Sequence, residues 1–150
     1  MNPLIRKMEL TDIVQVAAID VDSFSMPWPP RSYQFELTDN PASRSWVAEI
    51  DGQVVGMLVA WMIVDEIHIA TIATHRDFRR QGIAERLLTH ALQAARAEGA
   101  VTSFLEVREG NQAARQMYNK FHYVEVGRRK GYYKDNGEDA ILMSLDRIDM

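Results

Sequence analysis

Two arginines, a glutamine and a glycine stand directly before the clearest amphipathic helix of the chain, in the run Arg79-Arg80-Gln81-Gly82. The first turn of a helix leaves backbone N–H groups without partners, and the helix dipole places partial positive charge there. A glycine lets a ligand approach the main chain closely, because no side chain blocks it. The segment therefore suits a diphosphate group. The same residues also fit an ordinary glycine turn with two solvated arginines, since short glycine motifs often occur by chance.

A carboxylate interrupts an apolar stretch further along, at Glu106 in Phe104-Leu105-Glu106-Val107. The stretch predicts a mostly buried strand, and a buried carboxylate is costly unless it is paired or solvated. Glu106 is therefore a candidate general base at an opening in the sheet. Alternatively, it is paired with Arg108 or with an arginine of a neighbouring strand.

Tyr118 falls on the apolar face of the last helix that the sequence predicts. A tyrosine in such a position ordinarily packs in the core and bonds its hydroxyl nearby. Six acidic residues flank the irregular segment around Trp28 and the middle hairpin. Each fits a solvated rim, and as a group they could receive a cation: Asp20, Asp22, Glu36, Asp39, Asp65 and Glu66.

The composition excludes several other classes of protein. The chain has 150 residues, a net charge of −4 and no cysteine. We therefore expect one domain spanning residues 1–150, with no disulfide, no thiolate metal site and no nucleic-acid partner. The four histidines lack metal-ligand spacing, so no metal is expected. Neither a Gly-x-Ser-x-Gly elbow nor a Walker lysine is present. The N-terminus is not of signal-peptide type and the longest apolar run, 56–64, is too short for a bilayer, which predicts a cytoplasmic protein without a membrane partner.

Hydrophobic periodicity predicts the elements that must position these residues. Strands and helices are expected in the order β-α-α-β-β-β-α-β-α-β-β. Strands are predicted at 4–6, 46–50, 53–64, 67–74, 103–108, 123–128 and 139–145, and helices at 12–24, 31–37, 83–98 and 112–120, with Thr11 and Asn111 as caps of the first and last helix. Asp51-Gly52 predicts a hairpin turn. The fold class is therefore α/β (α+β), with a mixed sheet of six to seven strands flanked by about four helices.

The segment Arg79 to Ala84 resembles the R/Q-x-x-G-x-G/A signature of the GCN5-related N-acetyltransferase (GNAT) superfamily, and the expected element order matches that fold. A closer resemblance, to the RimI-type ribosomal-protein-alanine N-acetyltransferases, covers nearly the whole chain. It is carried by 24–28, 105–108, Asn111, Tyr118, 131–133 and 138–143. The sequence departs from the pattern at Thr71, Arg76 and Pro29, where many relatives have Asn, Pro and a capping Ser.

The resemblance implies acetyl-CoA as cosubstrate. Main-chain groups of Ile72, Ala73 and Thr74 would pair with the pantetheine arm, and Asn111 would contact the cofactor further along. The diphosphate would be held by the segment Arg79, Arg80, Gln81, Gly82, Ile83, Ala84 and Glu85, through its backbone amides from Arg80 onward.

The resemblance also implies that Glu106 accepts a proton from the amine, directly or through water, and that Tyr118 protonates the departing thiolate. Trp28, Tyr132 and Tyr133 would shape a peptide groove, with Asp65 and Glu66 at the acceptor side. Glu66 or His68 is the alternative base. A free α-amine has a pKa near 8, so neutralising it at pH 7 costs about 1 kcal/mol, against roughly 5 for lysine. A carboxylate base therefore suits an N-terminal amine.

The implied target is the N-terminal alanine of ribosomal protein S18, and the protein would be a monomer or weak dimer. Other N-termini, lysines or a small amine are alternative acceptors. A non-catalytic acyl-CoA-binding module is the alternative from a different class of protein.

Overall fold

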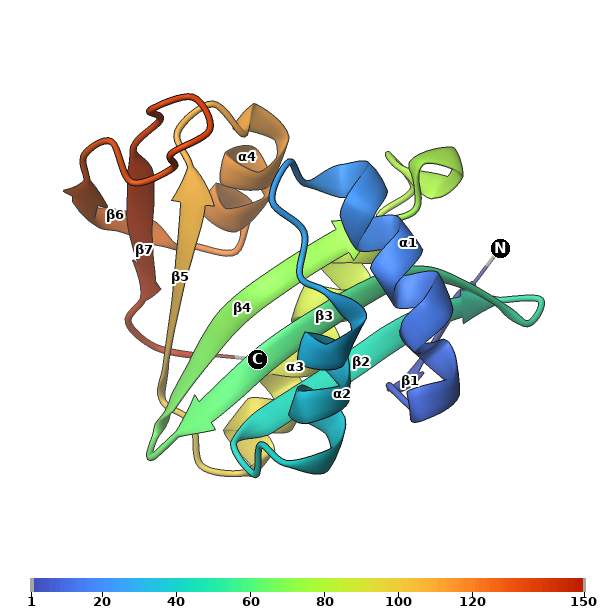
Figure 1. The fold of residues 1–150 in the computed structure, drawn as a ribbon. Coiled ribbons are helices and arrows are strands. Elements are labelled where there is room, and N and C mark those ends of the chain that lie inside the picture. Colours follow the sequence, from blue (N-terminus) through green and yellow to red (C-terminus); the bar gives the residue numbers. More distant parts are fainter. Residues whose placement is uncertain (1, 150) are drawn as a thin grey trace.

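The computed structural model describes residues 2–149 and shows one seven-stranded sheet with helices on both faces (Figure 1). The strands are β1 (Leu4–Lys7), β2 (Ser43–Ile50), β3 (Gln53–Ile63), β4 (Glu66–Thr74), β5 (Thr102–Arg108), β6 (Val124–Arg129) and β7 (Ala140–Leu145). The helices are α1 (Ile13–Ser23), α2 (Pro30–Thr38), α3 (Ile83–Ala97) and α4 (Gln112–Lys120), with short 3-10 turns at Leu10–Asp12 and Arg76–Phe78. The predicted fold class and element order are confirmed.

The strand order is β1-β2-β3-β4-β5-β7-β6, and β4 and β5 form the parallel pair. Helices α1 and α2 cover one face of the sheet and α3 covers the other (Figure 1). Alternate residues of β3 serve the two cores, because side chains in a strand point to opposite faces. Leu58 packs with the α3 side, whereas Met57 and Val59 pack with the α1 and α2 side. This strand lies inside the sheet, between β2 and β4.

The helix α3 is amphipathic, as its sequence predicts, and buries one apolar face. The buried positions of this helix are Ile83, Leu87, Leu88, Ala91, Leu92 and Ala95. Its N-terminus therefore has a fixed orientation on the sheet, since a whole apolar stripe must stay buried. Within residues 2–149, no helix is long and apolar enough to cross a membrane.

The start of α1 differs from the prediction. Asp12 is the cap residue, not Thr11, because a 3-10 turn precedes the helix. The Asp12 carboxylate accepts the Glu9 N–H at 2.7 Å and is held by Arg6 at 2.8 and 2.9 Å. This ion pair fixes the turn, and Thr11 is left exposed on it.

The parallel pair of β4 and β5 is short. Their pairing runs from Glu66 with Thr102 to Ile69 with Leu105, and then ends. At the same place β4 has an irregularity against β3, where Val59 faces Thr71 and Ala60 faces Ile69. Such a bulge bends a strand and breaks its ladder. The two strands consequently diverge toward their carboxyl ends, which opens the sheet (Figure 1).

Candidate active site

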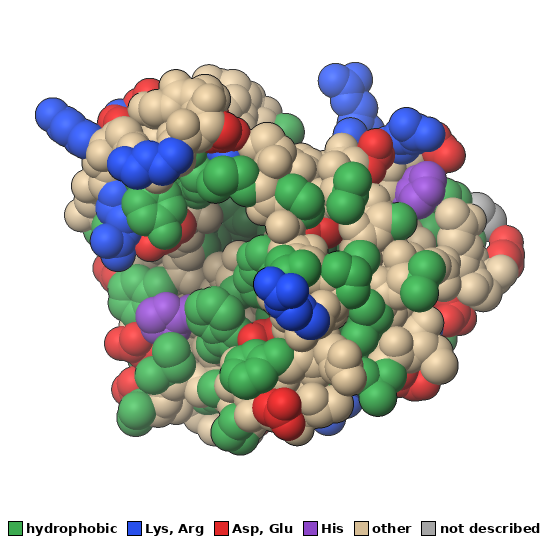
Figure 2. Space-filling model, viewed as in Figure 1, with side chains coloured by type: hydrophobic (Ala, Val, Ile, Leu, Met, Phe, Trp, Pro, Cys, Tyr) green, Lys and Arg blue, Asp and Glu red, His purple; other side chains and the backbone are tan. Residues whose placement is uncertain are grey.

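Two adjoining cavities occupy the opening between the diverging strands. One has a volume of about 220 Å³ and the other about 530 Å³. Phe24, Ile72, Asn111 and Ala114 line both, so a long ligand can pass from one to the other. Figure 2 shows the face of the molecule on which the surface is hollowed between the β5–β7 region and the segment that follows α1, with hydrophobic side chains at the rim.

The larger cavity lies at the N-terminus of α3. Arg80 and Gly82 have left-handed backbones, with φ of 65° and 77°, and a Cβ placed on Gly82 would meet no atom within 4 Å. The first amides of α3, which include those of Ile83 and Ala84, have no acceptor within the helix. The geometry therefore presents N–H groups and helix-dipole charge to an open cavity, as a diphosphate requires.

Most residues that the sequence assigned to cofactor binding come together there. Ile72, Ala73, Thr74, Arg79, Arg80, Gly82, Ile83, Ala84, Glu85 and Asn111 line the larger cavity. Gln81 does not; it lies in a neighbouring depression beside Ile5 and Arg86. The edge of β4 from residue 70 onward has lost β5 as its partner, so its backbone groups are available to an extended ligand arm.

Arg79 fixes the loop between β4 and α3. Its Nε donates to the carbonyl oxygen of Thr74 at 3.2 Å, and its Nη2 donates to Ser23 Oγ at 3.3 Å. The side chain thus joins the end of β4 to the end of α1. Asn111 plays a similar part at the junction of the two cavities, where its Oδ1 accepts the Ala114 N–H at 3.2 Å and caps α4.

Glu106 is not buried, which corrects the expectation from its apolar neighbours. Its side chain is 36% exposed and accepts a hydrogen bond from Arg129 Nε at 3.1 Å. The reason is strand alternation: Leu105 and Val107 point into the core, while Glu106 points to the face where β4 has moved away. Glu106 lines the smaller cavity. It is therefore both paired with an arginine of β6, the strand beyond its neighbour β7, and open to the cavity.

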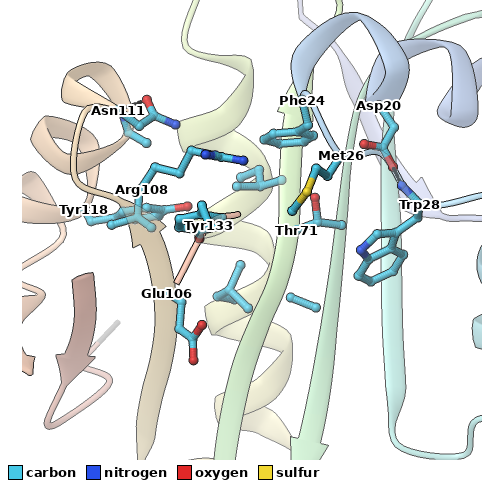
Figure 3. A pocket seen from close by; sticks show the side chains of 15 residues that line it. Asp20, Phe24, Met26, Trp28, Thr71, Glu106, Arg108, Asn111, Tyr118 and Tyr133 are labelled. Atoms are coloured by element: carbon cyan, nitrogen blue, oxygen red, sulfur yellow. Dashed lines mark hydrogen bonds between the residues drawn. The ribbon is translucent and has the colours of Figure 1, made fainter. Parts of the chain in front are cut away.

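Tyr118 is 4% exposed and its ring packs against Tyr123 at 5.6 Å between centroids. Its hydroxyl makes no hydrogen bond within residues 2–149, yet no buried side-chain oxygen there lacks a partner. The hydroxyl thus reaches the smaller cavity, which Tyr118 lines and toward which it points in Figure 3. Burial raises the pKa of Tyr118, so the group holds its proton at neutral pH.

Arg108 joins the two loops on either side of the smaller cavity. It donates to Asp135 at 3.0 Å through both terminal nitrogens, and to Ser25 Oγ at 3.1 Å. Ser25, which follows α1, also donates to Asp135 in the β6–β7 loop. We call Arg108, Ser25 and Asp135 the loop bridge. Sequence reasoning missed this bridge, because its members are distant in the chain and no pattern links them.

Asp20 also lines the smaller cavity, although its side chain belongs to the buried face of α1. Its Oδ2 accepts the Trp28 N–H at 3.0 Å and the Tyr33 hydroxyl. The expectation of a solvated rim is wrong for Asp20 and for Glu36, both of which are buried. The signal was present: Asp20 follows Val16 and Ile19 at helical spacing, which places it on the apolar stripe.

The residues expected at the acceptor side are divided. Trp28 and Tyr133 line the smaller cavity. Tyr132 packs edge-on against Tyr133, with 5.2 Å between ring centroids, and is 48% exposed. Asp65 and Glu66 lie at the turn into β4, at the closed end of the β4–β5 pair, and Glu66 bonds His68 at 2.9 Å. These two carboxylates line neither cavity.

An opened parallel pair, a helix N-terminus facing the gap and an acid and a base candidate beside it define an acyl-transfer site of one family. The Acetyltransferase (GNAT) family matches residues 13–123, and the chain belongs to it. It is an N-acetyltransferase, and its acetyl donor is acetyl-CoA.

Several proteins with the names of N-acetyltransferases are similar to this chain. A Bacillus subtilis protein, whose name gives ribosomal protein bS18-alanine N-acetyltransferase as a provisional activity, is 38% identical over 93% of this chain and 92% of its own. The crystal structure of the Escherichia coli ribosomal-protein-S18-alanine N-acetyltransferase has a TM-score of 0.90 at 28% identity, covering 99% of this chain and 95% of that one. An N-alpha-acetyltransferase of Sulfurisphaera tokodaii is 33% identical over 93% of this chain and 90% of its own.

Proposed function

We propose that the chain acetylates the α-amine of protein N-termini, with the N-terminal alanine of ribosomal protein S18 as its target. The names of the bacterial relatives give the substrate. The observation that carries the chemistry is that Glu106 and Tyr118 line one cavity of about 220 Å³ beside the unpaired edge of β4.

In this mechanism acetyl-CoA binds with its diphosphate at the amides from Arg80 to Glu85. Its pantetheine arm pairs with the β4 edge from Ile72 to Thr74, as a strand would. The thioester then lies in the smaller cavity, where Ala70 and Thr71 are part of the lining. An acetyl thioester is already activated, so the protein needs only to hold a neutral amine against the carbonyl.

Glu106 takes the proton of the amine, directly or through water, as the amine nitrogen attacks the thioester carbon. The C–S bond breaks, and Tyr118 gives its proton to the departing thiolate. Tyr118 suits this step because burial keeps its pKa high and its hydroxyl is free of other hydrogen bonds within residues 2–149. Both groups act as general catalysts without a covalent intermediate.

Trp28 and Tyr133 face each other across the mouth of the smaller cavity from the two loops that the bridge joins, and we assign them to the peptide groove (Figure 3). Tyr132 supports the Tyr133 ring from outside. Asp65 and Glu66 have no role in this proposal, because they lie at the closed end of the strand pair.

The test uses acetyl-CoA and a short peptide with the N-terminal sequence of S18. A second peptide has the same sequence with a blocked N-terminus and one free lysine. Mass and CoA release are followed for both. Acetylation of the free N-terminus alone supports the proposal. Transfer to the lysine alone would overturn the α-amine preference. Transfer to neither peptide, with acetyl-CoA bound, would overturn the S18 assignment and call for a panel of other N-termini.

A further inference from the structure

Three carboxylates are buried among residues 2–149: Asp12, Asp20 and Glu36. The two oxygens of Asp12 both accept hydrogen bonds from Arg6, at 2.9 and 2.8 Å. The two oxygens of Glu36 accept from Trp61 Nε1 at 2.6 Å and from Asn40 Nδ2 at 3.1 Å. Both groups are therefore fully satisfied by the protein, as buried carboxylates generally are.

Asp20 is different. Its Oδ2 receives both available donors, the Trp28 N–H and the Tyr33 hydroxyl. Its Oδ1 has no donor among the described residues, and no arginine, lysine or histidine there forms an ion pair with it. The side chain is only 2% exposed. Burial raises the pKa of Asp20, which the two hydrogen bonds to Oδ2 only partly offset.

The free oxygen is directed into the smaller cavity. Asp20 lines that cavity, and Figure 3 shows one carboxylate oxygen bonded toward Trp28 while the other points into the cavity beside Met26 and Thr71. To hold the Trp28 N–H and the Tyr33 hydroxyl, residue 20 needs only one acceptor oxygen and no negative charge. The second oxygen, in a site of low dielectric, is expected to bind a cationic donor strongly.

The charges around the cavity favour a cation. Asp20 and Glu106 line it as carboxylates, and Arg108 lines it as the cation. The guanidinium of Arg108 is already engaged by Asp135 and by Glu138, at 3.0 and 3.4 Å. Glu106 is likewise paired with Arg129 at 3.1 Å, so among the described residues that line the cavity Asp20 is the carboxylate without an ion-pair partner.

We propose that Asp20 is a further acceptor-binding residue, whose Oδ1 accepts a hydrogen bond from the α-ammonium of the incoming substrate. This inference rests on the proposed function and adds to it a contact on α1, on the other side of the cavity from Glu106. Asp20 binds the amine as it arrives, and the proton transfer is left to Glu106. The α-ammonium, and not only the peptide chain, then contributes to substrate affinity.

The first measurement needs only the wild-type protein. CoA is used in place of acetyl-CoA, because CoA carries no acetyl group and binding can be measured without reaction. Isothermal titration compares an alanine-first peptide with the same peptide carrying propionyl in place of alanyl, which removes the amine and nothing else. The amine is expected to tighten binding by roughly 10- to 100-fold, as a charge-assisted hydrogen bond in a desolvated site would. Equal affinities of the two peptides would overturn the inference.

The second measurement repeats this comparison with two variants. Asp20→Asn can keep an oxygen for Trp28 and Tyr33 while it turns an NH₂ toward the cavity, so the preference for the amine should disappear. Tyr33→Phe removes one hydrogen bond from Oδ2 but leaves the free oxygen, so the preference should persist. A preference retained in Asp20→Asn would contradict the proposal. A preference lost equally in both variants would show a structural role for Asp20.

Alanine amide, a small α-ammonium, separates this inference from the proposed function. If neither peptide binds but alanine amide binds in a manner that Asp20→Asn abolishes, the peptide substrate is wrong and the Asp20 site stands. If alanine amide fails to bind, or binds equally to the wild type and Asp20→Asn, while the peptides also fail, the Asp20 site is wrong as well.

Discussion

The guanidinium of Arg108 lies 3.9 Å from the centre of the Tyr133 ring and binds Asp135 through two nitrogens. Arg108 is the last residue of β5, Tyr133 and Asp135 belong to the β6–β7 loop, and Ser25 of the α1–α2 segment joins the same cluster. The two loops beside the smaller cavity are thus bound to each other and to β5, the strand that carries Glu106.

The loop bridge should be insensitive to pH in the range where the enzyme works. Arg108 above all, and then Ser25, hold the pKa of Asp135 at about 2, below its ordinary 3.8. A depressed carboxylate pKa contributes stability fully above the ordinary value and loses it as the pH falls through the lowered one. The peptide KM should therefore show no step from this pair between about pH 5 and 9. A step that disappears in Asp135→Asn would contradict this.

Breaking the bridge should affect peptide binding more than chemistry. Asp135→Asn removes the closer of the two carboxylates that hold Arg108, and this carboxylate is also the one that accepts the Ser25 hydroxyl, so the contact between the two loops is weakened. We expect the peptide KM to rise roughly three- to tenfold, with kcat and the acetyl-CoA KM little changed. Asp149→Asn is the matched control, since it removes the same charge at an exposed site near the C-terminus. Equal KM values for the two variants would exclude an anchoring role.

Glu106 and Arg129 allow catalysis and ion pairing to be separated. Glu106→Gln removes the base and should lower kcat by about 10²- to 10⁴-fold at neutral pH. Arg129→Gln breaks the same ion pair, with its 3.1 Å contact, but leaves the carboxylate in place. It should retain most of the turnover, because exposed ion pairs contribute little. Comparable losses in both variants would mean that Glu106 is structural.

Tyr118 and Tyr123 form a similar matched pair. The Tyr118 hydroxyl has no hydrogen bond within residues 2–149, whereas that of Tyr123 donates to the buried Ser103 Oγ at 2.7 Å. Tyr118→Phe should lower kcat by about 10²-fold or more and change the free energy of unfolding by less than about 0.5 kcal/mol. Tyr123→Phe should lower the free energy of unfolding by about 1–2 kcal/mol and leave kcat near its normal value. Denaturant unfolding and steady-state rates of both variants test this.

Gly82 should matter to the cofactor beyond its backbone strain. Gly82 and Gly137 have nearly the same left-handed φ, 77° and 75°, and neither has an atom within 4 Å of an added Cβ. Alanine at either position should therefore destabilise the protein by a similar amount, about 1–2 kcal/mol. Of the two glycines only Gly82 lines the larger cavity, so only Gly82→Ala should weaken acetyl-CoA binding. Titration of both variants with CoA would reveal the difference, and equal affinities would argue against the diphosphate site.

The elements of the fold were predictable because their signals are local. The apolar stripe of α3, the Asp51-Gly52 turn and the Asn111 cap all appear in the structure as the sequence predicted. Thr11 was misplaced because the cap depends on Arg6, which reaches Asp12 from β1. Such a contact between elements leaves no periodic mark in the sequence.

The site was predictable in its motif and less so in its environment. The glycine segment, apart from Gln81, and the residues of β4 line one cavity, and their contact with the cofactor stays a prediction. The exposure of Glu106 was misjudged because an apolar stretch reveals which residues alternate, but not where the neighbouring strand stops. Asp20 was grouped with surface acids, although its helical spacing from Val16 already placed it inside. The loop bridge depends on three separate segments and could not be read from any one of them.

Within residues 2–149, the four residue pairs between β4 and β5 are the only strand pairing between the first four strands and the last three. A cofactor arm that bonds to the loosened edge of β4 would lie where the missing strand pairing would have been. Bound acetyl-CoA would then bridge the two parts of the sheet, β1 to β4 and β5 to β7. Binding of acetyl-CoA would strengthen the junction of β4 and β5, and release of CoA would weaken it again. Turnover and the stability of this junction would therefore be coupled through the same unpaired backbone of β4.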